Sequence, residues 1–163
     1  MPMSEYVRCL RAAVGNQRLL LPSVTALIYD PLGRMLLVRQ REGDVWSTPG
    51  GAIEPDETPA DAVVREVWEE TKLLVSPKRV AGIFGGPDFV VRYENGDETQ
   101  YVMIAFECVI LAGTPQSDGE ETIDVRFWGP TEAPLLTPWL KPLFSTFLKP
   151  ETITPFQSAK WRP

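Results

Sequence analysis

The chain has 163 residues, of which 44% are hydrophobic and 23% are charged, as in one ordinary globular domain that buries a core. Its net charge of −6 argues against a protein that holds long nucleic acid by its phosphates, because such binding needs a basic surface. The chain contains no histidine, which excludes a Ser-His-Asp or Cys-His catalytic unit and any histidine-ligated zinc site.

The cysteines and the N-terminal segment indicate where the protein works. Cys9 and Cys108 belong to no CxxC motif or Cys/His cluster, so we expect both thiols to be reduced and inert, as in a cytosolic protein. The first 15 residues carry Glu5, Arg8 and Arg11 and lack the uninterrupted apolar core of a signal peptide. The apolar stretch YVMIAFECVIL is too short to span a bilayer. We therefore expect a cytoplasmic protein that does not associate with a membrane.

Apolar periodicity and turn residues predict a short helix followed by strands around a second helix. Residues 4–14 predict a helix that Ser4 caps and Gly15 ends. The predicted strands are 21–30, 34–41, 73–84 (interrupted by Pro77), 89–93, 99–111 and 122–128. Asn95-Gly96 between two apolar runs predicts a hairpin.

The C-terminal part completes the predicted domain. Residues 138–148 predict a closing helix, and 149–163 a proline-rich tail that is either packed on the body or a partner, or disordered. We treat 1–163 as one domain, with 1–19 as an N-terminal helical extension. Many strands with a central and a terminal helix predict an α+β or α/β sandwich with a mixed sheet. Both ends carry apolar residues without a chemical motif, so we expect them to serve packing or a homodimer.

Residues 58–71 predict the central helix. Thr58 fits the N-cap, Pro59 the first helical position, and Asp61 the acid of a capping box. At about 100° per residue, one side of this helix can face a sheet. That side carries Val63, Val64, Val67 and Thr71.

Three carboxylates, those of Glu66, Glu69 and Glu70, lie on the flank of the same helix, with Glu66 and Glu70 one turn apart. Acids near a helix C-terminus oppose the dipole, and like charges at i,i+4 repel by roughly a few tenths of a kcal/mol. One interpretation is a solvated cluster, paired in part with Arg65 and Lys72. The nearby glycine-rich turn favours another, because carboxylate oxygens suit Mg²⁺ or Mn²⁺ and a substrate phosphate can complete the coordination.

The segment from Gly51 to Leu73 resembles the Nudix box of the Nudix hydrolases, G-x5-E-x7-R-E-U-x-E-E-x-G-U, in which U is aliphatic. Every defined position matches except the last glycine, which is Lys72 in this chain. Trp46 and Pro49-Gly50-Gly51 are similar to the strand and turn that precede the box in the family. The resemblance covers roughly residues 20–148 and implies an α/β/α sandwich with a mixed sheet.

The resemblance also implies roles for the matching residues. The implied metal ligands are Glu66, Glu69, Glu70 and the carbonyl of Gly50, with Mg²⁺ or Mn²⁺ as the cofactor. Arg65 is implied to pair with Glu57, which supports the site together with Gly51. We place Arg65, Glu69 and Glu70 among the catalytic residues.

The implied reaction is hydrolysis of the diphosphate in a nucleotide or a nucleoside-diphosphate derivative, ADP-ribose-like or NTP-like. Because the chain has no histidine, a carboxylate must act as the base. Family members often place an additional acid in the loop that corresponds to 118–121, so Glu120 is our first candidate and Glu69 the second. A solvated turn is the alternative for this loop. The alternative function is a non-catalytic Nudix-type nucleotide-binding or sensor module, which would be expected to lose box glutamates that this chain keeps.

Substrate specificity should come from residues outside the box. Candidates to stack on a base are Phe84, Phe89, Tyr93 and Tyr101, with core packing as the alternative for each. Arg92 and Arg79 are candidates to contact a phosphate, with a surface role as the alternative. Pro87 stands about where some ADP-ribose pyrophosphatases of the family carry a proline.

Lys72 stands where the family's glycine is expected to turn left-handed just past the helix. A lysine in that conformation costs roughly 1–2 kcal/mol. An ammonium near the negative end of the helix offsets part of this, by roughly 0.3–1 kcal/mol. We expect Lys72 to be a structural exception that leaves the site intact.

Overall fold

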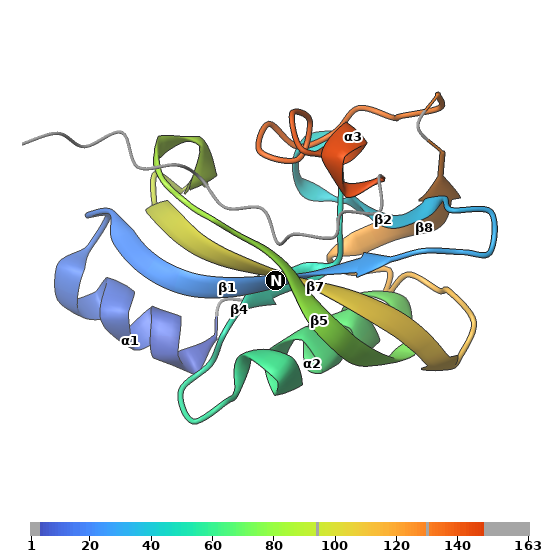
Figure 1. Cartoon of the computed structure of the whole chain (residues 1–163). Coiled ribbons are helices and arrows are strands. Elements are labelled where there is room, and N and C mark those ends of the chain that lie inside the picture. The colour runs from blue at the N-terminus through green and yellow to red at the C-terminus, as the bar shows by residue number, and fades with distance from the viewer. Residues whose placement is uncertain (1–3, 94, 130, 149–163) are drawn as a thin grey trace, which may run out of the picture.

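The computed structural model describes residues 4–93, 95–129 and 131–148, which form two β-sheets and three α-helices (Figure 1). The helices are α1 (Glu5–Val14), α2 (Pro59–Thr71) and α3 (Phe144–Phe147), with short 3-10 turns η1 (Glu42–Asp44) and η2 (Pro87–Phe89). The strands are β1 (Leu19–Ile28), β2 (Met35–Gln40), β3 (Trp46–Ser47), β4 (Gly50–Ala52), β5 (Leu74–Phe84), β6 (Val90–Arg92), β7 (Glu98–Ala112) and β8 (Thr122–Trp128).

The first sheet is mixed, as predicted. Its strand order is β4-β1-β7-β5, with β6 also paired to β7. β1 and β7 run parallel, while β4, β5 and β6 are antiparallel to their neighbours. The second sheet has the order β3-β2-β8 and its pairs are antiparallel.

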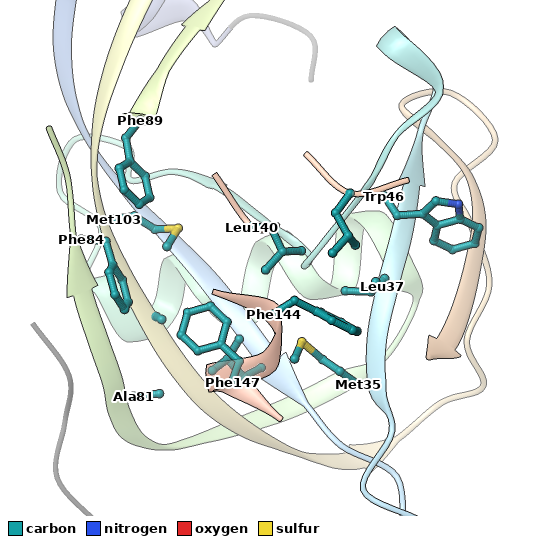
Figure 2. Close-up of a cluster of buried hydrophobic side chains, with 13 residues drawn as sticks. Met35, Leu37, Trp46, Ala81, Phe84, Phe89, Met103, Leu140, Phe144 and Phe147 are labelled. Atoms are coloured by element: carbon teal, nitrogen blue, oxygen red, sulfur yellow. The ribbon is translucent and has the colours of Figure 1, made fainter. Parts of the chain in front are cut away.

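Two apolar clusters cover opposite faces of the sheets. The α2-side core contains Val24, Ala26, Ile28, Leu36, Ala62, Val63, Val67, Leu73, Val75, Phe106 and Cys108. The α3-side core contains Leu27, Met35, Leu37, Trp46, Ala81, Phe84, Phe89, Met103, Ala105, Leu136, Leu140, Phe144 and Phe147 (Figure 2). Successive strand residues point to opposite faces, so the end of β1 serves both clusters, with Ala26 and Ile28 in the α2-side core and Leu27 in the α3-side core.

Helices lie on both sides of this strand layer. In Figure 1, α2 lies below the strands and α3 above them. The helix α2 contacts β5, β4 and β1, while the rings of Phe144 and Phe147 project from α3 into the other cluster (Figure 2). The architecture is the predicted α/β/α sandwich.

The N-terminal helix α1 forms where the sequence predicts it. The side chain of Ser4 accepts a hydrogen bond from the Val7 amide, and Gly15 ends the helix at φ 61°. No residue of α1 is buried. Arg11 holds the helix against the β6–β7 hairpin by donating to the Glu98 carbonyl at 2.7 Å.

The predicted hairpin between β6 and β7 is confirmed. Its turn closes through a bond from the Tyr93 amide to the Asp97 carbonyl at 3.0 Å, and Gly96 adopts φ 88°. Asn95 and Gly96 therefore form the turn that their sequence predicts.

Two predictions about secondary structure are wrong in part. Pro77 does not interrupt its strand, because β5 runs through it and the pairing with β7 shifts register between Pro77 and Arg79. The closing helix is shorter than predicted, with turns before α3. Pro142 explains the difference, since a proline inside a helix has no amide proton and its ring clashes with the preceding turn.

Among the described residues, none of the helices has the length and apolar character needed to cross a membrane. The predicted tail, 149–163, lies outside the described residues. Its predicted part in packing or in a homodimer therefore stays a prediction.

Gly50 begins β4 in direct contact with β1. It adopts φ 154°, and a Cβ atom there would collide with the Val24 carbonyl oxygen and lie 2.7 Å from the Thr25 Cα. We expect Gly50→Ala to lower the free energy of unfolding by roughly 2–4 kcal/mol, through strain and overpacking.

Gly33 provides the control for this prediction. It also has a positive φ, of 72°, but its Cβ would meet nothing within 4 Å. Gly33→Ala should therefore cost only about 1–2 kcal/mol, from backbone conformation alone. Urea unfolding of both variants measures the difference, and equal losses would contradict the close approach of β4 to β1.

Candidate active site

The helix α2 carries the candidate site on the edge that faces β4. Its start is fixed as predicted, because Thr58 Oγ1 accepts from the Asp61 amide at 3.1 Å and Pro59 occupies the first turn. Its apolar side packs on the sheet, with Val63, Val67 and Thr71 buried. This packing also determines which acidic side chains of the helix are turned inward.

Glu66 and Glu70 are both buried, with 0% and 6% of their surfaces exposed. They lie one helical turn apart, so their side chains are neighbours. Glu70 Oε2 accepts from the Gly50 amide at 2.9 Å, and Glu66 Oε1 accepts from Arg65 at 2.8 Å. The second oxygen of Glu66, Oε2, is buried without a hydrogen-bond partner.

Burial changes the protonation of this pair. Burial raises the pKa of Glu66 to about 7, against the lowering effect of Arg65. Burial, followed by the charge of Glu66, raises the pKa of Glu70 well above its usual value. Two buried carboxylates with an unpaired oxygen are costly unless a proton or a cation neutralises them.

Arg65 connects α2 to the loop before it, and the predicted pair with Glu57 forms. Its guanidinium donates to both Glu57 oxygens at 2.8 and 2.9 Å and to the Ala52 carbonyl at 3.1 Å. The hydrogen bonds from Arg65, opposed by burial, hold the pKa of Glu57 below its usual value. Arg65 thereby holds β4 and the loop that follows it against α2, and it also contacts Glu66.

Glu69 lies at the rim of the pair. Its side chain is 52% exposed, and one oxygen lies 3.2 Å from Arg65 Nη1. The structure thus brings together Gly50, Glu66 and Glu70 and leaves Glu69 at the solvent boundary.

The loop between β7 and β8 reaches the end of α2. The Gln116 amide donates to the Thr71 carbonyl at 2.9 Å, and Thr122 Oγ1 donates to the Glu70 carbonyl at 3.1 Å. Within this loop Glu120 is exposed, whereas Glu121 is partly buried. The charge of Glu121 contributes to the raised pKa of Glu66 and of Glu70.

Glu121, which adjoins Thr122, lies near the buried pair and was not singled out from the sequence. No pattern distinguishes it from its neighbour Glu120, because both precede the same strand. Which of the two side chains is partly buried depends on how the loop is held, and that is a property of the folded chain.

The arrangement of Glu66 and Glu70 is compatible with a divalent-cation site that takes few protein ligands. Within the described residues, no three Asp, Glu, Cys or His side chains lie together as a group that could hold a metal ion. Mg²⁺ commonly binds through one or two carboxylates and leaves other positions to water and substrate phosphate. Glu66 and Glu70, with the unpaired Glu66 Oε2, could supply such a partial set of ligands.

Two of the four predicted stacking residues belong to the core. Phe84 and Phe89 are buried in the α3-side core, where their ring centroids are 6.2 Å apart, so core packing describes both. Tyr93 and Tyr101 share a hydrogen bond between hydroxyls at 3.0 Å.

The two arginines that were predicted to contact a phosphate each form an ion pair with an acid. Arg92 pairs with Glu98 at 2.7 Å, and Arg79 pairs with Glu107 at 2.6 Å. The surface role that was the alternative for these arginines agrees with their exposure.

The comparison with known families agrees with the geometry of the box. Residues 19–147 match the NUDIX domain. The chain belongs to the Nudix family. Glu66, Glu69 and Glu70 are therefore the glutamates of its Nudix box, and Lys72 is its departure from the pattern.

Proteins that are similar in sequence to this chain carry different names. A MutT-like protein of Streptomyces ambofaciens is 33% identical over 100 residues, which cover 61% of this chain and 58% of that protein. A putative 8-oxo-dGTP diphosphatase of Bacillus subtilis is 28% identical over 109 residues, covering 67% of this chain and 66% of that protein. The aligned part is thus less than two thirds of the length of each relative.

Solved structures give the same fold. The crystal structure of a UDP-X diphosphatase superposes with a TM-score of 0.67 at 25% identity, covering 88% of this chain and 68% of that chain. An ADP-ribose pyrophosphatase from Streptococcus suis gives a TM-score of 0.67 at 25% identity, covering 84% and 98%.

Lys72 adopts the left-handed conformation predicted for the family's glycine, with φ 58° and ψ 19°. Its ammonium donates to the Glu69 carbonyl at 3.2 Å, at the negative end of α2. We expect Lys72→Gly to change the free energy of unfolding by no more than about 1 kcal/mol, because relief of strain opposes the added entropy of the unfolded chain.

The matched variant Lys72→Ala keeps the strain and loses the ammonium, so it should be less stable than wild type by about 0.3–1 kcal/mol. Thermal unfolding and turnover measure both variants. Turnover should stay within a few-fold for each, and a drop near a hundredfold in a folded protein would instead place Lys72 at the substrate.

Proposed function

We propose that this Nudix protein is a metal-dependent pyrophosphohydrolase that cleaves the diphosphate of a nucleotide or a nucleoside-diphosphate derivative, ADP-ribose-like or NTP-like. The observation that carries the proposal is the buried Glu66–Glu70 pair, with its unpaired oxygen and raised pKa values. The names of the relatives, which include diphosphatases and a pyrophosphatase, support the same reaction class. A non-catalytic module is less consistent with a chain that keeps every box glutamate.

The residues of the site would have different roles in metal binding and in orienting the ligands. Glu66 and Glu70 would hold Mg²⁺ or Mn²⁺, with Glu69 at the rim and the Gly50 carbonyl as a further ligand. The bound cation would neutralise the diphosphate charge and favour attack by water. Arg65 keeps Glu66 oriented, since it bonds Glu57 and the β4 turn at the same time.

The hydrolysis needs a proton acceptor for the attacking water. Water adds to phosphorus, the bond to the bridging oxygen breaks, and the proton passes to a carboxylate. We propose Glu121 for this role in place of Glu120, because Glu121 adjoins Thr122, which bonds the Glu70 carbonyl. Glu69 remains the second candidate.

The nucleotide derivative, the cytoplasmic location and a homodimer stay predictions. Incubating the chain with a panel of nucleoside triphosphates, ADP-ribose and nucleoside-diphosphate sugars in Mg²⁺ tests activity and substrate together. Chelation by EDTA should abolish any hydrolysis, and hydrolysis that persists in EDTA would remove the basis for a metal site.

Replacing Glu70 by Gln tests the buried pair. The amide keeps the size but loses the charge that offsets a cation, so we expect kcat to fall about a hundredfold or more. Mg²⁺ should also raise the Tm of the wild-type protein but not that of Glu70→Gln, since a ligand stabilises only the state that binds it. The control is Glu132→Gln, an exposed acid whose variant should keep both properties.

The neighbours Glu120 and Glu121 provide a matched pair for the base. Each is replaced by Gln in turn, so that the two variants differ only in position. We expect kcat to fall further for Glu121→Gln, because its carboxylate acts on Glu66 and Glu70. The reverse order in steady-state kinetics would return the role to Glu120.

A further inference from the structure

Arg41 holds the loop that carries Glu121, although it lies outside the Nudix box and directly follows β2. Its Nε donates to the Glu120 carbonyl and its Nη2 to the Gly119 carbonyl, both at 2.7 Å. Its backbone amide donates to the Glu121 carbonyl at 2.9 Å. One residue thus fixes three consecutive carbonyls.

The amides of the same loop are fixed from within by Asp118. Its Oδ1 accepts from the amides of Glu120, Glu121 and Thr122 at 2.9, 3.0 and 2.9 Å. Gly119 completes the turn at φ 76°. The backbone on both sides of the Glu121 side chain is therefore hydrogen-bonded on its amide and its carbonyl groups.

The loop is also tied to the helix that carries the buried pair. Thr122, which follows Glu121, donates to the Glu70 carbonyl, and Gln116 donates to the Thr71 carbonyl. The position of the Glu121 backbone relative to α2 thus depends on Arg41 at one side and on Thr122 at the other.

We propose that Arg41 is a positioning residue, which holds residues 119–121 so that the Glu121 carboxylate faces the Glu66–Glu70 pair. The inference rests on the proposed function of this site. Arg41 is exposed, and hydrogen bonds at an exposed site add little to folding stability. The guanidinium fork reaches two carbonyls at once, a geometry that the single ammonium of a lysine does not reproduce.

The variants Arg41→Ala and Arg41→Lys test this role, with Arg39→Ala as the control. Arg39 lies two residues earlier and pairs with Asp44 at 2.6 Å, so its variant also removes an arginine and a surface contact. We expect kcat to fall about 10–100-fold in Arg41→Ala with KM within about threefold, an intermediate loss in Arg41→Lys, and no loss in Arg39→Ala.

A second measurement separates positioning from a general loss of structure. The losses of Arg41→Ala and Glu121→Gln should not multiply, because Arg41 acts through Glu121. The double variant should be as slow as Glu121→Gln alone. Multiplied losses, or an Arg41→Ala variant with wild-type kcat, would overturn the proposal.

Hydrogen exchange gives a readout that does not depend on activity. The amides of residues 120–122 should exchange faster in Arg41→Ala than in wild type or Arg39→Ala, with the Tm almost unchanged. Unchanged exchange would overturn the proposal even if the variant lost activity. A wild-type protein that hydrolyses no substrate would refute the proposed function alone, since the exchange experiment would still report whether Arg41 orders the loop.

Discussion

The burial of two carboxylates side by side is the constraint on which the rest of the site depends. Glu66 and Glu70 lie near the C-terminal end of α2, where the helix dipole already disfavours negative charge. Burial adds a desolvation cost that raises the pKa of each group. Neither side chain can turn to solvent without moving the helix, because Val63 and Val67 of the same helix are anchored in the α2-side core. The fold therefore keeps two carboxylates in a place where a cation or a hydrogen-bond donor would stabilise them.

Protein groups provide part of this stabilisation from two directions. The Gly50 amide donates to the Glu70 carboxylate, and the Arg65 guanidinium donates to the Glu66 carboxylate. The close approach of β4 to β1 delivers the first of these donors, which is why position 50 has no room for a side chain. The unpaired Oε2 of Glu66 shows that the protein groups leave one acceptor unmet. In the proposed function, a divalent cation would bind this oxygen.

The end of α2 is as closely organised as the carboxylates. The last carbonyls of a helix have no partner within it. Here the carbonyls of residues 68–71 accept from the Lys72 amide, the Lys72 ammonium, Thr122 Oγ1 and the Gln116 amide in turn. Two of these donors come from the β7–β8 loop, so the contact that completes the helix also brings Glu121 near the buried pair. Helix termination and site assembly use the same loop, and Arg41 adds a link from this loop to β2.

The sequence by itself determined the features that depend on short-range pattern. The spacing of the box and the cap at Thr58 involve residues within one turn or one loop, where local chemistry limits the choices. The Arg65–Glu57 pair and the left-handed exit at Lys72 were instead implied by the resemblance to the Nudix box, and the structure has both. The mixed sheet was predicted from the many strands that accompany a central and a terminal helix. Only the tertiary structure distinguishes Glu120, which is exposed, from Glu121, which is partly buried, because contacts with Arg41 and with α2 over long sequence distances orient that loop. It also placed Phe84 and Phe89 in the core and carried β5 through Pro77, since burial and strand register depend on partners that a local pattern does not contain.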